Sequence, residues 1–357
     1  MTLKEKTLRG LAWTGIQNWG SRALTFVVFL LLARLLTPED FGVVALATVF
    51  IAFAQVFVDQ GFAEALIQRE DLEPGHLDTA FWANLGLGVL LSALSFVAAP
   101  LVATLFDEPK LIAVVRWLSL LFVLRALAGV QAAILTRDFD FRALAFRRLM
   151  GVMAGGVLGV VMAVMGFGVW SLVGQQLCGA LVEAGVLWWA SDWAPGWGLG
   201  REYFKDLFSF GINITGTNLL NFANRRSDDL LIGYFLGPVA LGYYTVAYRL
   251  LLILTDLLAN TINQVALPAF ARLQKEPKRL LDAFYKATNL ASLVAFPCFV
   301  GLAVLAPELT RGVFGEKWLP SVPVMQVLAL IGILHSVFNL NAPLMVAVGK
   351  PSWRLGV

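Results

Sequence analysis

The sequence predicts an all-α integral membrane protein whose two halves repeat one another in the same orientation. Hydrophobic residues make up 59% of the 357 residues and charged residues only 14%. Apolar runs long enough to cross a bilayer recur along the whole chain, which is typical of a multi-pass helical membrane protein. In addition, lysine and arginine gather in alternate loops, and segments 200 residues apart share residues at equal spacing.

Ten apolar segments are predicted to be membrane helices. Each approaches or exceeds the ~20 residues that a helix needs to cross ~30 Å of hydrocarbon. The first is too long for the core of a signal peptide and lacks a small-residue cleavage site, so we interpret it as a retained helix. The predicted spans are 12–36, 41–63, 77–104, 111–136, 148–167, 169–190, 207–236, 239–266, 284–306 and 321–348.

The distribution of basic residues predicts the orientation of these spans. Loops on one side carry most of the lysines and arginines, with clusters at 137–148 and 272–286. The opposite loops and their borders carry Arg34, Lys110, Arg116, Arg311 and Lys317. By the positive-inside rule, the N-terminus and the basic loops are expected in the cytoplasm.

The two halves are predicted to form a parallel repeat. At an offset of 200 residues the sequence pairs Leu36 with Leu236, Pro38 with Pro238, Gly42 with Gly242, and Ala47 with Ala247, and a weaker echo links Ala99-Pro100 with Ala306-Pro307. Six spans separate the partners, an even number, so both halves point the same way across the membrane. The predicted domains are 1–200 (spans one to six) and 201–357 (spans seven to ten), with the Gly-, Pro- and Trp-containing loop 191–205 as the joint.

One predicted span, 207–236, carries an unusual number of polar and charged residues. A stripe of roughly 120° on this helix holds Thr217, Asn218, Asn221, Arg225, Asp228 and Asp229, and the span also carries Asn224 and Arg226. If the helix ends near Leu236, the charged cluster lies about 10 to 17 Å below the outer end. Ionisable groups at that depth normally face a water-filled cavity, so this helix is predicted to line the path of a bulky polar solute.

Other spans show the same one-sided pattern and complete a predicted cavity. Arg22, Arg125 and Arg249 are expected at about mid-depth, where guanidinium groups suit a phosphate or carboxylate, and amides suit sugar hydroxyls. The candidate cavity residues are Asn18, Arg22, Arg125, Asn218, Asn221, Arg249 and Asn260, and in span two Thr48, Gln55 and Asp59 share a face. The alternative is that each arginine pairs locally with an acid such as Asp59, Glu183 or Asp256.

Candidate gating and ion-coupling residues are acidic groups at membrane depth. Because arginines lie beside them, Asp228 and Asp229 are interpreted as a standing ion-pair gate with Arg225 and Arg226 rather than as a proton relay. The better titrating candidates are Asp59, Glu183 and Asp256. A phosphate-binding loop, a metal-binding histidine motif and a soluble catalytic domain are all missing from this sequence, so no cofactor, no metal and no enzymatic activity are expected.

Four stretches of the sequence resemble the polysaccharide transporter family. They are LLTPEDFG (35–42), RDFDFRALAFRRL (137–149), GFGVWSLVGQQL (166–177) and LGPVALGYY (236–244). The chain is similar to the lipopolysaccharide and colanic-acid exporter branch of that family, within the multidrug/oligosaccharidyl-lipid/polysaccharide flippase superfamily. The resemblance implies two helical bundles in a V around a central cavity. Relatives carry more spans than the ten predicted here, which implies a C-terminally truncated chain.

The resemblance also implies a function. Such proteins flip undecaprenyl-pyrophosphate-linked oligosaccharides across the bacterial inner membrane by alternating access, driven by a proton or sodium gradient. The implied partners are the lipid-linked oligosaccharide, membrane lipids and polysaccharide polymerase machinery, without nucleic acid. One alternative is a multidrug or metabolite antiporter of the same superfamily, which would want an acidic pocket. Another is a glycan-polymerising enzyme, which would want a large outer loop, whereas the outer loops here are short.

Overall fold

The computed structural model describes residues 3–58, 62–69, 71–198, 200–274, 276–338 and 340–348. Every regular element in these ranges is helical. The chain divides into two compact units, Met1–Gly242 and Tyr243–Val357, and each is described by itself.

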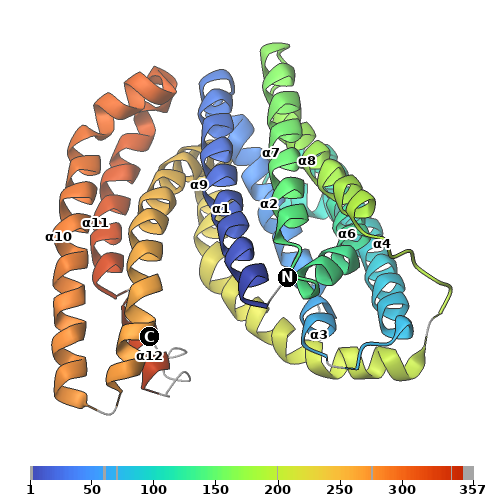
Figure 1. Cartoon of the computed structure of the whole chain (residues 1–357). Helices are drawn as coiled ribbons and strands as arrows, with labels where there is room; N and C mark the ends of the chain where they lie inside the picture. The colour runs from blue at the N-terminus through green and yellow to red at the C-terminus, as the bar shows by residue number, and fades with distance from the viewer. Residues whose placement is uncertain are drawn as a thin grey trace. The chain divides into compact units, whose positions relative to one another are not determined.

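The N-terminal unit is a bundle of long helices connected by short turns (Figure 1). Its helices follow the first six predicted spans, except that span two is divided into α2 and α3 and span four into α5 and α6. They are α1 (Leu3–Leu35), α2 (Pro38–Val58), α3 (Phe62–Gln68), α4 (Pro74–Leu105), α5 (Lys110–Leu118), α6 (Leu120–Arg137), α7 (Phe141–Val164), α8 (Val169–Ala190) and the first part of α9 (Arg201–Leu273).

Glycines bring three helices of this unit together. A β-carbon on Gly155 of α7 would overlap the backbone carbonyl of Gln175 in α8. On the neighbouring position Gly156, a β-carbon would overlap the side chain of Val28 in α1. The missing side chains therefore let the backbone of α7 approach both helices closely, as small residues do in membrane bundles.

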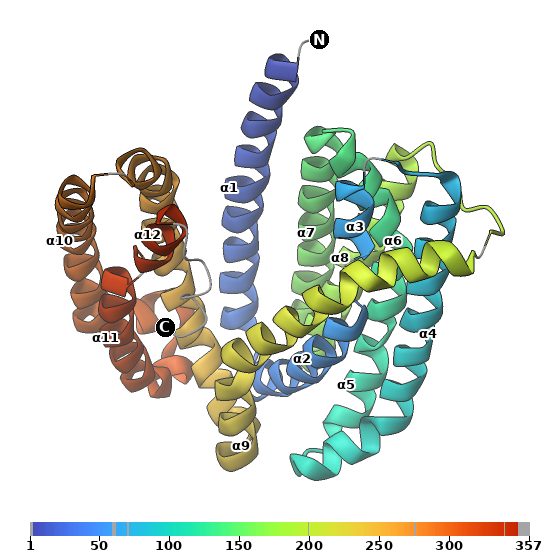
Figure 2. The same cartoon turned by 90° about the horizontal axis from the view of Figure 1, so that it is seen from below.

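The segment that leads into α9 is fixed to the start of α4. The backbone N–H of Gly196 donates to Asp78 at 2.9 Å, and the indole N–H of Trp82 donates to the carbonyl of Gly196 at 2.7 Å. One turn into α9, the Tyr203 hydroxyl donates to Glu73 at 2.7 Å. Figure 2 shows this part of α9 running across the end of α3. The predicted joint at 191–205 is thus tied to the N-terminal unit.

The division between the units falls after Gly242, later than the predicted domain boundary at residue 200. The described contacts of the 191–205 segment explain why the start of α9 belongs with the preceding helices. Within α9 the backbone is non-helical at Gly237, with φ 80° and ψ 177°. A positive φ is a conformation that glycine adopts without a steric penalty. The predicted domains 1–200 and 201–357 are the two halves of the predicted internal repeat, and this division stays a prediction.

Two matching proline–glycine segments meet inside the N-terminal unit. A β-carbon on Gly42 of α2 would overlap the carbonyl of Pro238 in α9. A β-carbon on Gly242 of α9 would overlap the carbonyl of Pro38 in α2. The two contacts are reciprocal, so these residues, paired in sequence at an offset of 200, are also paired in space.

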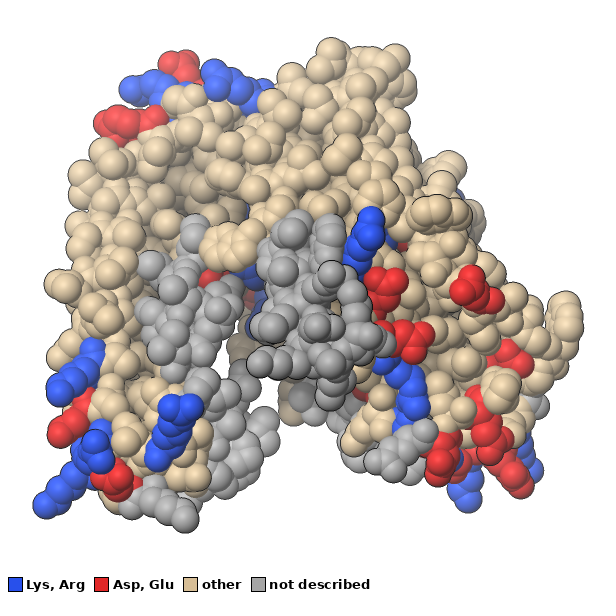
Figure 3. Space-filling view, in the orientation of Figure 1, with Lys and Arg blue, Asp and Glu red and all other residues tan. Residues whose placement is uncertain are grey.

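The C-terminal unit contains the rest of α9 and a helical hairpin. The hairpin comprises α10 (Pro277–Leu309), a π-helical turn (Thr310–Phe314), a 3₁₀ segment (Glu316–Ser321) and α11 (Val322–Phe338), and α12 (Asn341–Ala347) follows. Trp318 is fully buried and makes an edge contact with Tyr243. On the face drawn in Figure 3, charged side chains of this unit gather at its two ends, with an uncharged band between.

The exposed apolar surface is that of a membrane protein. In α4, Val97 is 78% exposed and Leu101 72% exposed, which suits contact with lipid rather than water. Seven helices in the described part of the chain are long and apolar enough to cross a bilayer. The predicted all-α, multi-pass membrane protein is confirmed at this level, while the number of ten spans stays a prediction.

Candidate functional site

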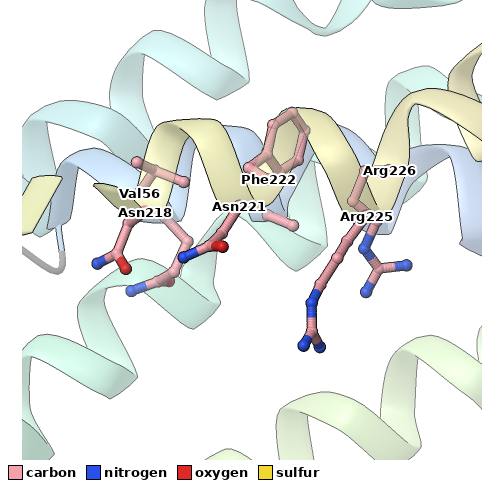
Figure 4. Close-up of a pocket in the computed structure, with 8 residues that line it drawn as sticks. Val56, Asn218, Asn221, Phe222, Arg225 and Arg226 are labelled. Atoms are coloured by element: carbon pink, nitrogen blue, oxygen red, sulfur yellow. The ribbon is translucent and has the colours of Figure 1, made fainter. Parts of the chain in front are cut away.

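A polar cavity lies between α2 and α9 of the N-terminal unit (Figure 4). Its volume is about 280 Å³. The lining residues are Ala52, Gln55 and Val56 from α2, and Asn218, Asn221, Phe222, Arg225 and Arg226 from α9. The lining therefore combines three amides and two guanidinium groups with the apolar side chains of Ala52, Val56 and Phe222.

Helical periodicity explains why α9 contributes these side chains. Asn218, Asn221 and Arg225 are spaced by three and four residues, so they share one face of the helix. Figure 4 shows their side chains pointing to the same side. The structure therefore places two of the predicted cavity residues, Asn218 and Asn221, beside Arg225, which was predicted as a gate residue.

The predicted cavity residue Arg125 is connected to this wall through Gln55. The guanidinium of Arg125, in α6, donates to the side-chain oxygen of Gln55 at 3.1 Å. Gln55 is buried and its amide is neutral, so this bond orients Arg125 without cancelling its charge. The sequence left open that Arg125 pairs with an acid; the partner in this bond is instead the neutral amide of Gln55.

The described ion pair in the charged part of α9 joins Arg226 and Asp229. The two groups are 2.9 Å apart and one turn apart on the helix. Asp229 is only 8% exposed, so the arginine compensates a carboxylate that is largely removed from solvent. Asp228 lies beside this pair, and its predicted pairing with Arg225 as a gate stays a prediction.

Glu183 lies away from the cavity. Its carboxylate accepts a hydrogen bond from Arg148 of α7 at 3.2 Å, so it joins α7 to α8. This contact is of the local, helix-connecting kind that the sequence left open as the alternative for such acids. A role of Glu183 in ion coupling stays a prediction.

The other predicted residues are not tested by the cavity. Arg22 lies on α1 of the N-terminal unit, whereas Arg249 and Asp256 belong to the C-terminal unit. The convergence of Arg22, Arg125 and Arg249 therefore stays a prediction. Asp59 and the side chains of Asn18 and Asn260 lie outside the described residues.

Sequence reasoning missed part of the lining. Gln55 and Phe222 line the cavity, but they were not among the predicted cavity residues, and Arg225 and Arg226 had been assigned to the gate. A signal existed for Gln55, because it shares a face of the second span with Thr48 and Asp59. The position of Phe222 carries no comparable signal, since an apolar residue in a membrane helix is expected on any face.

The chemistry of the lining favours an anionic ligand with hydroxyl groups. Guanidinium groups bind phosphate or carboxylate through paired hydrogen bonds, and they stay charged at any physiological pH. Side-chain amides can donate to and accept from hydroxyls. Among the residues that the structure describes, no group of three or more His, Cys, Asp or Glu is placed to hold a metal ion.

Two solved structures have a similar fold. The inward closed conformation of the lipid II flippase MurJ has a TM-score of 0.76 at 15% identity, over 95% of this chain and 76% of MurJ. An inward-facing multidrug resistance MATE family transporter of the MOP superfamily has a TM-score of 0.68 at 16% identity, over 92% of this chain and 81% of that chain. The fold is thus that of the membrane transporters of this superfamily.

The sequence then gives the family. The chain belongs to the polysaccharide biosynthesis protein family, which matches residues 31–323.

Two relatives illustrate this family. The chain is 31% identical to the teichuronic acid biosynthesis protein TuaB of Bacillus subtilis, over 100% of this chain and 75% of TuaB. It is 29% identical to the lipopolysaccharide biosynthesis protein WzxC of Escherichia coli, over 98% of this chain and 72% of WzxC. The predicted resemblance to the polysaccharide transporter family is confirmed.

Proposed function

We propose that the protein is a flippase that moves a lipid-linked oligosaccharide, of the undecaprenyl-pyrophosphate type, across the bacterial inner membrane for cell-surface polysaccharide synthesis. The observation that carries the proposal is the cavity in which Arg225 and Arg226 lie beside Asn218, Asn221 and Gln55. The guanidinium groups would compensate the pyrophosphate, and the amides would bind sugar hydroxyls. No residue in this lining is expected to do covalent chemistry, in keeping with transport rather than catalysis.

The names of similar proteins support the same substrate class. WzxC is named a lipopolysaccharide biosynthesis protein, and MurJ is named a lipid II flippase. A third relative, 31% identical over 92% of this chain and 67% of its own length, is the succinoglycan biosynthesis transport protein ExoT of Rhizobium meliloti. We infer from these names that the solute is a polysaccharide precursor, and that polymerase machinery receives it on the outer side.

Alternating access is the proposed mechanism, and it uses two bundles that form a parallel repeat. The reciprocal contacts of Gly42 with Pro238 and of Gly242 with Pro38 support the repeat, because an exact exchange of partners is what a twofold relation between halves produces. The ten spans and the cytoplasmic N-terminus belong to the same proposal. The proposal also includes coupling of transport to protons or sodium. The residues proposed for this coupling are Asp59, Glu183, Asp228, Asp229 and Asp256.

The second candidate is a cation antiporter, as the fold shared with a multidrug transporter suggests. Such a function needs negative charge where the cation binds. The lining holds Arg225 and Arg226 and no acid, and the acid paired with Arg226, Asp229, is not a lining residue. The lining therefore favours the flippase.

A reconstituted flipping assay tests the proposal directly. The protein is placed in liposomes that contain a fluorescent lipid-pyrophosphate oligosaccharide, and the accessibility of the label to an external quencher is followed. We expect the wild type to equilibrate the lipid between leaflets. Uptake of a cationic dye without movement of the lipid-linked sugar would favour the antiporter instead.

A further inference from the structure

Both units contain a helix that is interrupted by proline near its end. Pro100 lies in the last turns of α4, and Pro307 in the last turn of α10. Proline has no N–H, so in each helix the carbonyl four residues earlier loses its donor. The affected carbonyls belong to Phe96 and Ala303. In an apolar segment water does not take the place of the missing donor, so each carbonyl needs another partner.

In the N-terminal unit that partner is Arg116. Its Nε donates to the carbonyl of Phe96 at 3.3 Å. Its guanidinium carbon also lies 4.4 Å from the centre of the Phe96 ring. Arg116 thus contacts the side chain and the carbonyl of one residue, and it comes from α5, the helix that follows α4. The sequence had assigned it only to the outer border of the membrane.

In the C-terminal unit the partner is Gln326. Its side-chain N–H donates to the carbonyl of Ala303 at 3.2 Å, and it comes from α11, the helix that follows α10. The carbonyls are 207 residues apart (303 minus 96), as are the prolines (307 minus 100), whereas the donors are 210 apart (326 minus 116). The donor therefore lies 16 residues after the proline in the N-terminal unit (116 minus 100) and 19 after it in the C-terminal unit (326 minus 307). The weak sequence echo between the two Ala-Pro pairs therefore marks a shared structural feature.

We propose that Arg116 and Gln326 are positioning residues whose hydrogen bonds stabilise α4 at Pro100 and α10 at Pro307. We call each of these hydrogen bonds a lock. Each lock makes a helical hairpin, α4 with α5 or α10 with α11, move as one rigid unit during transport. A proline often lets a membrane helix bend, because it removes one of the backbone hydrogen bonds that keep the helix straight. Here the carbonyl is already held by the next helix, so bending at the proline would break that bond as well. Val97 and Leu101 beside Pro100 are exposed apolar side chains, which suits contact with lipid rather than water. The inference about transport rests on the proposed flippase function, but the lock itself does not.

The lock is tested by restoring the missing donor. Arg116→Met removes the hydrogen bond, and we expect the melting temperature of the purified protein to fall by about 2–4 °C. Pro100→Ala gives the Phe96 carbonyl a backbone donor. The double variant Pro100→Ala/Arg116→Met should therefore have the same melting temperature as Pro100→Ala alone. Additive effects of the two changes would overturn the lock.

Matched variants separate hydrogen bonding from charge. Arg116→Gln should retain most of the stability, because the other unit uses glutamine in this role, whereas Arg116→Lys should not restore it fully. The reverse order would show that Arg116 acts through its charge at the lipid headgroups and would overturn the proposal. In the C-terminal unit, Gln326→Leu should be destabilising, and Pro307→Ala should remove that effect.

The transport claim has its own readout. Pro100→Ala should flip lipid-linked oligosaccharide at the wild-type rate, because a locked break does not bend during the cycle. Slower flipping with unchanged melting would overturn the rigid hairpin. If no variant and no wild-type protein flips the lipid, the proposed function fails, while the melting experiments still decide the lock.

Discussion

Gly42 of α2 lies directly against the carbonyl group of Pro238 in α9, with no space for a side chain between them. Gly242 and Pro38 form the same contact with the roles exchanged. This pair of contacts joins the start of α2, which begins at Pro38, to the part of α9 that follows the non-helical residue Gly237. It also explains why proline and glycine recur together at an offset of 200 residues.

The first prediction concerns this contact. Gly42→Ala should destabilise the protein by about 1 to 3 kcal/mol, because the added methyl forces two backbones apart. Thermal unfolding in detergent measures the effect. Gly86→Ala in α4 is the control, since a β-carbon there meets nothing within 4 Å. Equal melting temperatures for the two variants would contradict the close contact.

The second prediction concerns the charge of the cavity. Arg225→Gln should lower the rate of flipping at limiting substrate by about tenfold, because one charge-assisted contact to the pyrophosphate is lost. Asn224→Ala is the matched control, since Asn224 is adjacent on α9 but does not line the cavity. The abundance and melting of both variants should be unchanged. Equal flipping rates for Arg225→Gln and Asn224→Ala would show that Arg225 does not bind the substrate.

The third prediction concerns the bond between Gln55 and Arg125. Gln55→Glu places a carboxylate 3 to 4 Å from the guanidinium, as judged by the 3.1 Å bond in the native protein. The new ion pair should leave stability intact or raise it, but it should slow flipping because it cancels the positive charge of Arg125. Gln55→Leu should slow flipping less, since it removes the bond and keeps the charge. Faster flipping by Gln55→Glu would instead favour a cationic solute.

The fourth prediction concerns Arg226 and Asp229. Arg226→Ala should destabilise the protein by about 1 to 3 kcal/mol, because it leaves a largely buried carboxylate without its partner. Arg226→Ala/Asp229→Ala should recover part of that loss, which a double-mutant cycle measures. The neighbouring Arg225→Ala serves as the control for removing a cavity arginine. A cycle with no coupling would show that the pair contributes nothing.

The fifth prediction concerns pH and the attachment of α9. The hydrogen bond to Glu73 raises the pKa of Tyr203 above its ordinary value of 10.0, because an ionised phenol would face a carboxylate and lose its donor. The stabilisation should therefore be complete below pH 10 and be lost as the pH rises through the pKa of the folded state. The difference in melting temperature between the protein and Tyr203→Phe should shrink above pH 10. A difference that persists there would contradict this bond.

The sequence by itself determined that the protein crosses a membrane with long helices, that two segments repeat, and that one face of α9 is polar. These features are local, because the length of an apolar run and the spacing of Asn218, Asn221 and Arg225 can be read without any partner. The family resemblance likewise depends on short stretches of residues.

Only the tertiary structure decided which of the polar groups meet. It joined Gln55 to Arg125, joined Arg226 rather than Arg225 to Asp229, and moved Glu183 into a contact between α7 and α8. It also gave Arg116 the carbonyl that Pro100 leaves free. The physical reason is that such pairings depend on how neighbouring helices are rotated and spaced, and that is set by close packing between residues far apart in the chain.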